Sequence, residues 1–228
     1  MQTGTMLYVA STWVLPVLLA VTLHEAAHGF VAHLLGDDTA YRLGRVSFNP
    51  LKHVDPFGTI LMPAILLFLR SPFLFGYAKP VPVNYRALRH PRRDMVLVAA
   101  AGPATNIALA MVAALLFPIA SYLPPEVGAW IAQNLKNALV INVVLAVFNM
   151  LPLPPLDGGR VAVGLLPKFL ADPLANLEPY GMMILITLLF FVPMFGAQRG
   201  IDLNIISRLL RTPTDFILRA IVQLTGNG

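Results

Sequence analysis

Cysteine is missing from the sequence, and its absence excludes two kinds of chemistry. Without thiols the chain forms no disulfide bonds and offers no thiolate ligand to a metal. Any metal site must therefore be built from histidine and carboxylate side chains. The redox state of the compartment in which the protein works is left open.

Charged residues are also scarce. Only 12% of the 228 residues are charged and 57% are hydrophobic, whereas a soluble domain carries about 25% charged residues. This composition excludes an ordinary soluble protein and predicts an integral membrane protein in a lipid bilayer. Because one span takes about 20 residues, we expect an all-α polytopic fold with about four to six membrane segments. We also expect a single domain over residues 1–228, with a core at about 7–170 and a C-terminal part at about 179–228.

The excess of basic residues is modest, with 16 Lys and Arg against 11 Asp and Glu. Much of it lies in one loop, which contains Arg86, Arg89, Arg92 and Arg93. In a membrane protein such a loop indicates orientation and contact with anionic lipid rather than nucleic acid. We therefore expect no nucleic-acid partner and place this loop in the cytoplasm.

The motif His24-Glu25-Ala26-Ala27-His28 interrupts an apolar run that extends over residues 7–35. Two histidines at positions i and i+4 share one face of a helix, so both can reach a single zinc ion. Glu25 beside them can accept a proton from the attacking water. Ionisable residues in an apolar helix are functional candidates. The motif thus predicts a hydrolytic zinc site in the membrane; the alternative is a pair of core histidines hydrogen-bonded across a helix bundle.

A catalytic zinc needs a third protein ligand and an open position. The best candidate is Asp157, which lies in a proline-rich segment, residues 152–160, at the end of an apolar helix. This segment must unwind, and non-helical backbone at membrane depth is expected only where it is buried or lines a wet cavity. The alternative is an ordinary Asp-Gly turn. His33 lies five residues after His28 and therefore faces away from the pair.

Three apolar stretches are long enough to be membrane helices, namely residues 7–35, 95–123 and 130–151. Residues 39–49 alternate imperfectly, which predicts a small β-strand or hairpin whose edge, over 41–48, could extend a substrate by strand addition. Residues 57–78 contain Pro63 and Arg70. These two residues favour a re-entrant segment or a cavity-lining helix over a single crossing of the membrane.

The C-terminal part contains three further segments. Residues 161–170 predict a short interfacial helix, and residues 181–192 form a short apolar segment whose crossing is left open, as is the side of the C-terminus. Residues 203–224 carry Arg208, Arg211 and Arg219 with the spacing of an amphipathic surface helix.

Membrane orientation follows from the need to bring distant residues to one metal. The helices over residues 7–35 and 130–151 must end on the same membrane side if His24, His28 and Asp157 are to meet. The helix over residues 95–123 must begin on that side, next to the basic loop. By the positive-inside rule we expect the active site nearer the cytoplasmic face.

Three motifs in this order resemble the site-2 protease family of intramembrane zinc metalloproteases. They are His24-Glu25-x-x-His28, Ala101-Gly102-Pro103-x-x-Asn106 and Asn149-x-x-Pro152-x-Pro154-x-x-Asp157-Gly158-Gly159. The resemblance covers about the first 170 residues. The sequence GYAKPVPVN over residues 76–84 is similar to a small prokaryotic branch, without a PDZ domain or a nucleotide-binding module.

The resemblance implies one Zn²⁺ per chain, bound by His24, His28 and Asp157, with Glu25 as general base. It further implies that Asn149 and Asn106 position the substrate backbone or the oxyanion. The substrate would be a transmembrane protein, cut in or near its membrane segment in the plasma membrane of a prokaryotic cell.

Two other classes of protein use similar residues. A membrane metal-ion transporter could pass zinc through the same His/His/Asp site, and a catalytically silent scaffold could retain the motif. Glu25 separates these readings, because hydrolysis needs a base whereas transport has no evident need for a carboxylate that is not a ligand. The substrate and the oligomeric state do not follow from the sequence.

Overall fold

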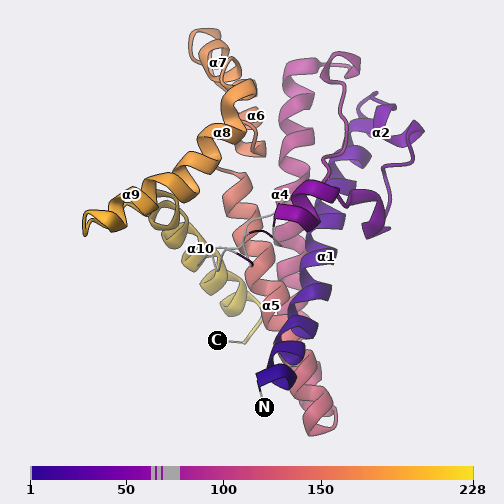
Figure 1. The fold of residues 1–228 in the computed structure, drawn as a ribbon. Helices are drawn as coiled ribbons and strands as arrows, with labels where there is room; N and C mark the ends of the chain where they lie inside the picture. The colour runs from indigo at the N-terminus through magenta and orange to yellow at the C-terminus, as the bar shows by residue number, and fades with distance from the viewer. Residues whose placement is uncertain (1, 63–64, 66–67, 69–77, 228) are drawn as a thin grey trace.

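The computed structural model describes residues 2–62, 65, 68 and 78–227 and is built from helices. Figure 1 shows that its long helices are α1 (Gln2–Leu34), α4 (Pro91–Leu116), α5 (Pro125–Asn149) and α10 (Ile205–Leu224). Within the described residues, four helical stretches are long and apolar enough to cross a membrane: Leu7–Leu34, Pro91–Tyr122, Pro125–Asn149 and Lys168–Gln198. The predicted all-α polytopic membrane fold is confirmed.

Shorter helical elements connect the long ones. Those between α1 and α4 are α2 (Thr39–Arg42), η1 (Pro50–His53), η2 (Pro56–Leu61) and η3 (Tyr85–Ala87), and η4 (Phe117–Tyr122) follows α4. Those after α5 are α6 (Asp157–Leu165), α7 (Lys168–Ala175), η5 (Glu178–Tyr180), α8 (Gly181–Ile186), η6 (Thr187–Phe191) and α9 (Val192–Gln198). The short apolar segment predicted at 181–192 is therefore part of a longer helical stretch.

The β-strand or hairpin predicted over residues 39–49 is wrong. Thr39–Arg42 forms the single helical turn α2, and no strand occurs in the part of the chain that the structure describes. Asp37 is fully buried and accepts a hydrogen bond from the Thr39 backbone N–H at 2.9 Å, which stabilises a turn instead of an extended ladder. Strand addition at 41–48 therefore has no edge to use. The re-entrant segment predicted at 57–78 lies mostly outside the described residues.

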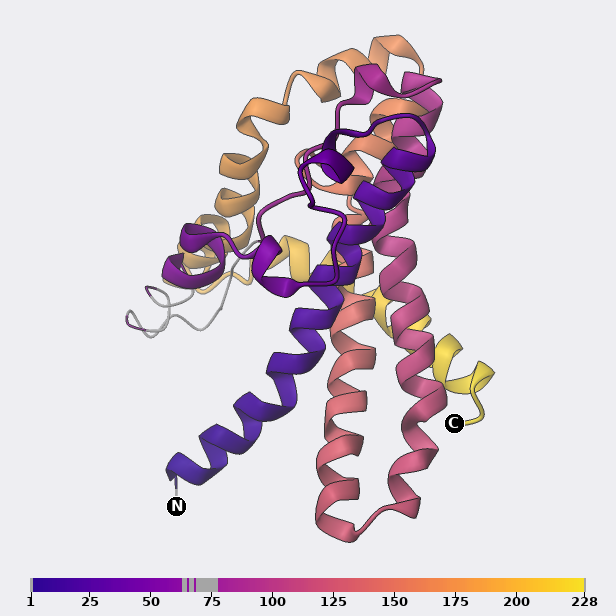
Figure 2. The ribbon, with the colours of Figure 1, turned by 90° about the vertical axis from the view of Figure 1, so that its right-hand side faces the viewer.

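Three helix ends meet at one end of the bundle. The Arg89 backbone N–H donates to the Leu35 carbonyl, just after α1, at 3.0 Å. The Arg92 guanidinium, at the start of α4, donates to the carbonyls of Gly164 at 3.1 Å and of Leu166, at the end of α6. Figure 2 shows α4 and α5 as a hairpin whose turn lies at the opposite end. The end of α1, the start of α4 and α6 thus share one side, as the sequence predicts.

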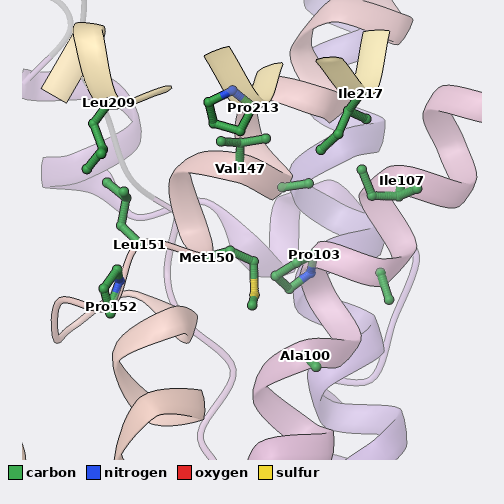
Figure 3. Close-up of a pocket in the computed structure, with 12 residues that line it drawn as sticks. Ala100, Pro103, Ile107, Val147, Met150, Leu151, Pro152, Leu209, Pro213 and Ile217 are labelled. Atoms are coloured by element: carbon green, nitrogen blue, oxygen red, sulfur yellow. The ribbon is translucent and has the colours of Figure 1, made fainter. Parts of the chain in front are cut away.

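The C-terminal helix α10 packs across α4 and α5. A buried cluster joins the three helices and consists of Ala110, Ala114, Val143, Val147 and Ile221. The same helices and the segment after α5 line an open apolar cavity of about 580 Å³, into which Pro103, Pro213 and Ile217 point (Figure 3). Since α4 turns one face to this cavity and another to α1, the cavity lies on the opposite side of α4 from the histidine motif. The predicted amphipathic helix exists, with Arg208, Arg211 and Arg219 exposed.

Candidate metal centre

The histidine motif on α1 faces one stripe of α4. Val98, Gly102 and Asn106 are spaced four residues apart and so lie on the same face of α4. His28 Nδ1 is 2.7 Å from the Val98 carbonyl oxygen, and His24 Nδ1 is 2.6 Å from Asn106 Oδ1. These two contacts fix the register of the antiparallel pair and place both imidazole rings over Gly102 of α4.

Gly102 lies between these two contacts and is needed for the close approach of α4. A Cβ atom at this position would lie 2.5 Å from His24 Cε1 and 2.5 Å from His28 Nε2. Such distances are far below van der Waals contact, so any side chain here must displace the imidazoles. The glycine of the Ala101-Gly102-Pro103 motif therefore leaves room for the rings.

We expect Gly102→Ala to abolish zinc binding, because its methyl group would occupy the space of both imidazoles. Zinc per chain, measured by elemental analysis of the purified protein, should fall from about one to near zero. Ala108→Val, which adds bulk at an exposed position of the same helix, should retain the metal. Full zinc occupancy in Gly102→Ala would contradict this packing.

Asp157 reaches the histidines because the chain turns sharply after α5. Helix α5 ends at Asn149 and the next helix, α6, begins at Asp157 itself. A Cβ atom on Gly158 would lie 2.2 Å from the Met150 carbonyl oxygen, so only glycine lets the first turn of α6 pack on this loop. The predicted unwinding of residues 152–160 is confirmed for 152–156, whereas residues 157–160 form the first turn of α6, which starts before the helix predicted at 161–170.

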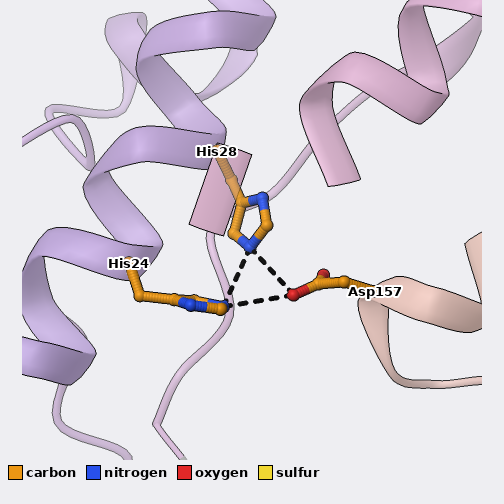
Figure 4. A group of neighbouring side chains, drawn as sticks. All are labelled: His24, His28 and Asp157. Carbon is orange, nitrogen blue, oxygen red and sulfur yellow. Dashed lines mark hydrogen bonds and ion pairs between the residues drawn. The ribbon is translucent and has the colours of Figure 1, made fainter. Parts of the chain in front are cut away.

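Three potential ligand atoms converge between α1 and α6 (Figure 4). His24 Nε2 and His28 Nε2 are 3.1 Å apart, and Asp157 Oδ2 lies 3.2 Å from the first and 3.4 Å from the second. All three residues are buried. Ligand atoms of a tetrahedral zinc site lie about 3.3–3.5 Å apart when each is about 2.0–2.2 Å from the ion. The triangle is therefore of the right size for zinc.

The hydrogen bonds around the rings determine where the protons lie. The Val98 carbonyl can only accept, so His28 donates from Nδ1 and its Nε2 carries a lone pair. The same holds for His24, because Asn106 Oδ1 accepts from its Nδ1. Asp157 Oδ2 is buried and receives no hydrogen bond from a donor. Lone pairs on His24 Nε2, His28 Nε2 and Asp157 Oδ2 thus point into one buried space, and a bound cation would stabilise this arrangement. The alternative of two core histidines hydrogen-bonded to each other does not fit, because neither Nε2 carries a proton to donate.

Glu25 lies between the two histidines in sequence and is half-buried. Its Oε2 accepts the backbone N–H of Val81 at 2.8 Å. Val81 belongs to an extended stretch whose far end is held by Asp37, which accepts the Asn84 N–H at 2.6 Å. The carboxylate of Glu25 is therefore held by the stretch that leads into α4.

His33 takes no part in the cluster, as its spacing predicts. Its ring stacks on Tyr41, with the centroids 4.4 Å apart, and its Nδ1 lies 2.8 Å from Asp38 Oδ1. Hydrogen bonds from His33 and Arg42 lower the pKa of the Asp38 carboxyl. Across the described residues, His24, His28 and Asp157 form the one cluster of side chains that could hold a metal ion.

Comparison with known proteins agrees with this geometry. The family model of Peptidase family M50 matches residues 119–192. The Bacillus subtilis protein YwhC, whose name describes it as a zinc metalloprotease, is 39% identical over 211 residues, which cover 87% of this chain and 92% of YwhC. The chain belongs to peptidase family M50. The resemblance to the site-2 proteases is thereby confirmed.

Further relatives of this M50 peptidase carry the same description. Rip2 of Mycolicibacterium smegmatis is 29% identical over 187 residues, which are 82% of this chain and 68% of Rip2. MJ0611 of Methanocaldococcus jannaschii is 45% identical over 64 residues, which are 28% of this chain and 31% of MJ0611. No solved structure matches the chain significantly. The protein is a zinc metalloprotease of the lipid bilayer that acts on protein substrates.

The two asparagines predicted as substrate-positioning residues occupy different surroundings. Asn149, the last residue of α5, is partly buried and donates its Nδ2 to the Leu145 carbonyl at 3.0 Å. Asn106 is fully buried, its Oδ1 lies 2.6 Å from His24 Nδ1, and its Nδ2 donates to the Ala20 carbonyl and to Asn142 Oδ1. The structure therefore brings Asn106, but not Asn149, into contact with the histidine pair.

Two contributors to the site were missed at the sequence level. The Val98 carbonyl is a backbone group, so no side-chain pattern marks it. Asn142 accepts a hydrogen bond from Asn106 and donates one to the Ala138 carbonyl. In the sequence it is marked only by being a polar residue in an apolar helix. Four asparagines share that signal on the same helix, so it could not single out Asn142.

Proposed function

We propose that this M50 peptidase is an intramembrane endopeptidase that hydrolyses a peptide bond in or near a transmembrane segment of its substrate protein. The supporting observation is the depth of the cluster. His24 and His28 lie within the candidate span Leu7–Leu34, and His24 is about 15 Å from its C-terminal end at 1.5 Å per residue. A peptide bond brought to the cluster is therefore inside the apolar layer.

In this proposal His24, His28 and Asp157 hold the metal. Zinc, when bound, polarises the scissile carbonyl and lowers the pKa of water toward neutrality. Glu25 accepts the proton of the attacking water and delivers it to the leaving amine. The hydrogen bond from Val81 orients the Glu25 carboxylate for both transfers.

Asn149 is proposed to position the substrate. Its Nδ2 carries two N–H groups. One donates to the Leu145 carbonyl, four residues earlier in the same helix, and the other can donate to a substrate carbonyl. The substrate in turn must become extended, because a helix engages its own carbonyls in hydrogen bonds from residue i to residue i−4.

We propose that the protein lies in the prokaryotic plasma membrane with the metal nearer the cytoplasmic face. The end of α1 and the start of α4 share one side, and the exposed residues Arg86 and Arg89 lie there. The connection between α4 and α5, on the other side, contains no Lys or Arg over residues 117–125. The positive-inside rule then assigns the basic side to the cytoplasm.

Arg89→Cys should be protected from a membrane-impermeant thiol reagent in intact cells and should react after permeabilisation. The matched control is Ser121→Cys, an exposed position in η4, which should react in intact cells. The native chain has no cysteine to confuse the labelling. Labelling of Arg89→Cys from outside would overturn the orientation.

The proposed activity can be tested in vesicles that hold the purified protein and a panel of single-span candidate substrates. Cleavage should occur, stop when a chelator removes the metal and return when zinc is added. If no substrate is cut while zinc crosses the vesicle membrane through the protein, the rival function, metal transport, is correct.

A further inference from the structure

We infer that Asn106, held in place by Asn142, is a positioning residue for the metal centre that sets the tautomer and orientation of His24. This inference rests on the proposed function in one respect, namely that His24 is a zinc ligand. It gives Asn106 a role behind the ligand, in place of contact with the substrate.

The first step is the contact between Asn106 and His24. At 2.6 Å, Asn106 Oδ1 is the partner of His24 Nδ1, and both side chains are buried. A neutral imidazole carries its proton on either nitrogen, and only the Nδ1–H form leaves Nε2 free to bind a metal. An acceptor at Nδ1 selects that form and holds the plane of the ring.

The second step is the orientation of the Asn106 amide, which serves His24 only if its oxygen points to the ring. Two acceptors hold its nitrogen on the other side, Asn142 Oδ1 at 2.7 Å and the Ala20 carbonyl at 3.2 Å. Asn142 is itself oriented, because its Nδ2 donates to the Ala138 carbonyl at 2.8 Å. The direction of each hydrogen bond is therefore determined in the series that runs from Asn142 on α5 through Asn106 on α4 to His24 on α1.

The two histidines differ in how they are held. His28 is held by the backbone carbonyl of Val98, which a substitution cannot remove. His24 instead depends on the side chain of Asn106, so the orientation of one of the three proposed zinc ligands is controlled by residues of α4 and α5. Asn106 completes the Ala101-Gly102-Pro103-x-x-Asn106 motif, whose glycine makes room for the same two rings.

Asn106→Leu should weaken zinc binding by about 10–100-fold, the usual effect of removing a partner of a ligating histidine. Zinc affinity of the full-length protein in detergent, with zinc alone as the probe, can be measured by competition with a chromophoric chelator. Asn137→Leu is the matched control, since buried Asn137 donates to the Thr12 carbonyl across the α1–α5 interface away from the metal. It should bind zinc as the unaltered chain does. An Asn106→Leu variant with unchanged affinity, or an equal loss in Asn137→Leu, would overturn the inference.

A second pair of variants keeps the test decisive if Asn106→Leu does not fold. Asn142→Asp retains an oxygen for the Asn106 amide and should bind zinc nearly as well as the unaltered chain, whereas Asn142→Leu should bind it more weakly. Equal affinities in these two variants would contradict the role of Asn142. Because affinity is read without any substrate, a protein that binds zinc but cuts nothing would refute the proposed protease function and leave this inference standing.

Discussion

Glu25→Gln is expected to retain zinc and to lose cleavage by at least about 10²–10⁴-fold, the usual contribution of a general base. The amide has nearly the same shape as the carboxylate and can still accept the Val81 N–H through its oxygen. It cannot take a proton from the attacking water. The substitution therefore removes one step of the reaction while leaving the architecture of α1 in place.

Two measurements on the same Glu25→Gln preparation check this result: zinc per chain by elemental analysis and the initial rate of cleavage. Loss of zinc would show that Glu25 is a ligand. Undiminished turnover would show that another group is the base.

His24→Ala and Asp157→Ala are each expected to lower the zinc content from about one ion per chain to near zero. Each removes one of three buried ligand atoms that lie 3.1–3.4 Å apart, and each leaves the remaining two without a complete donor set. Cleavage should be lost together with the metal.

His33→Ala is the matched control for these two variants. It removes a histidine of the same helix that stacks on Tyr41 and bonds to Asp38 instead of facing the cluster. Its zinc content should be unchanged. Full zinc retention in either His24→Ala or Asp157→Ala would refute the ligand assignment.

The sequence predicted the parts of the fold that depend on local pattern. Length and apolar character located the long helices α1, α4 and α5 to within about five residues, when η4 is counted as the continuation of α4. The i, i+4 spacing placed both histidines on one face. Asp157 could be chosen because prolines forced the preceding segment out of the helix, and the ends of α1 and α5 had to meet if a metal was shared.

The parts that failed depend on tertiary contacts. Alternation at 39–49 suggested a strand, but buried Asp37 stabilises a helical turn there. The role of Asn106 in positioning the substrate stays a prediction, but its bond to His24 was not foreseen because it arises from the packing of α4 against α1. Asn142 looked like its neighbouring asparagines until the α4–α5 interface was visible.

The most direct test of the central claim is the position of the bond that is cut in a single-span substrate. The protein and substrate are reconstituted together in lipid vesicles, and the products are identified by mass spectrometry, with Glu25→Gln protein as the blank. We predict new termini within, or a few residues from, the apolar segment of the substrate, formed only when zinc and Glu25 are both present. Cuts confined to the soluble parts of the substrate, or the same products from Glu25→Gln protein, would contradict the account.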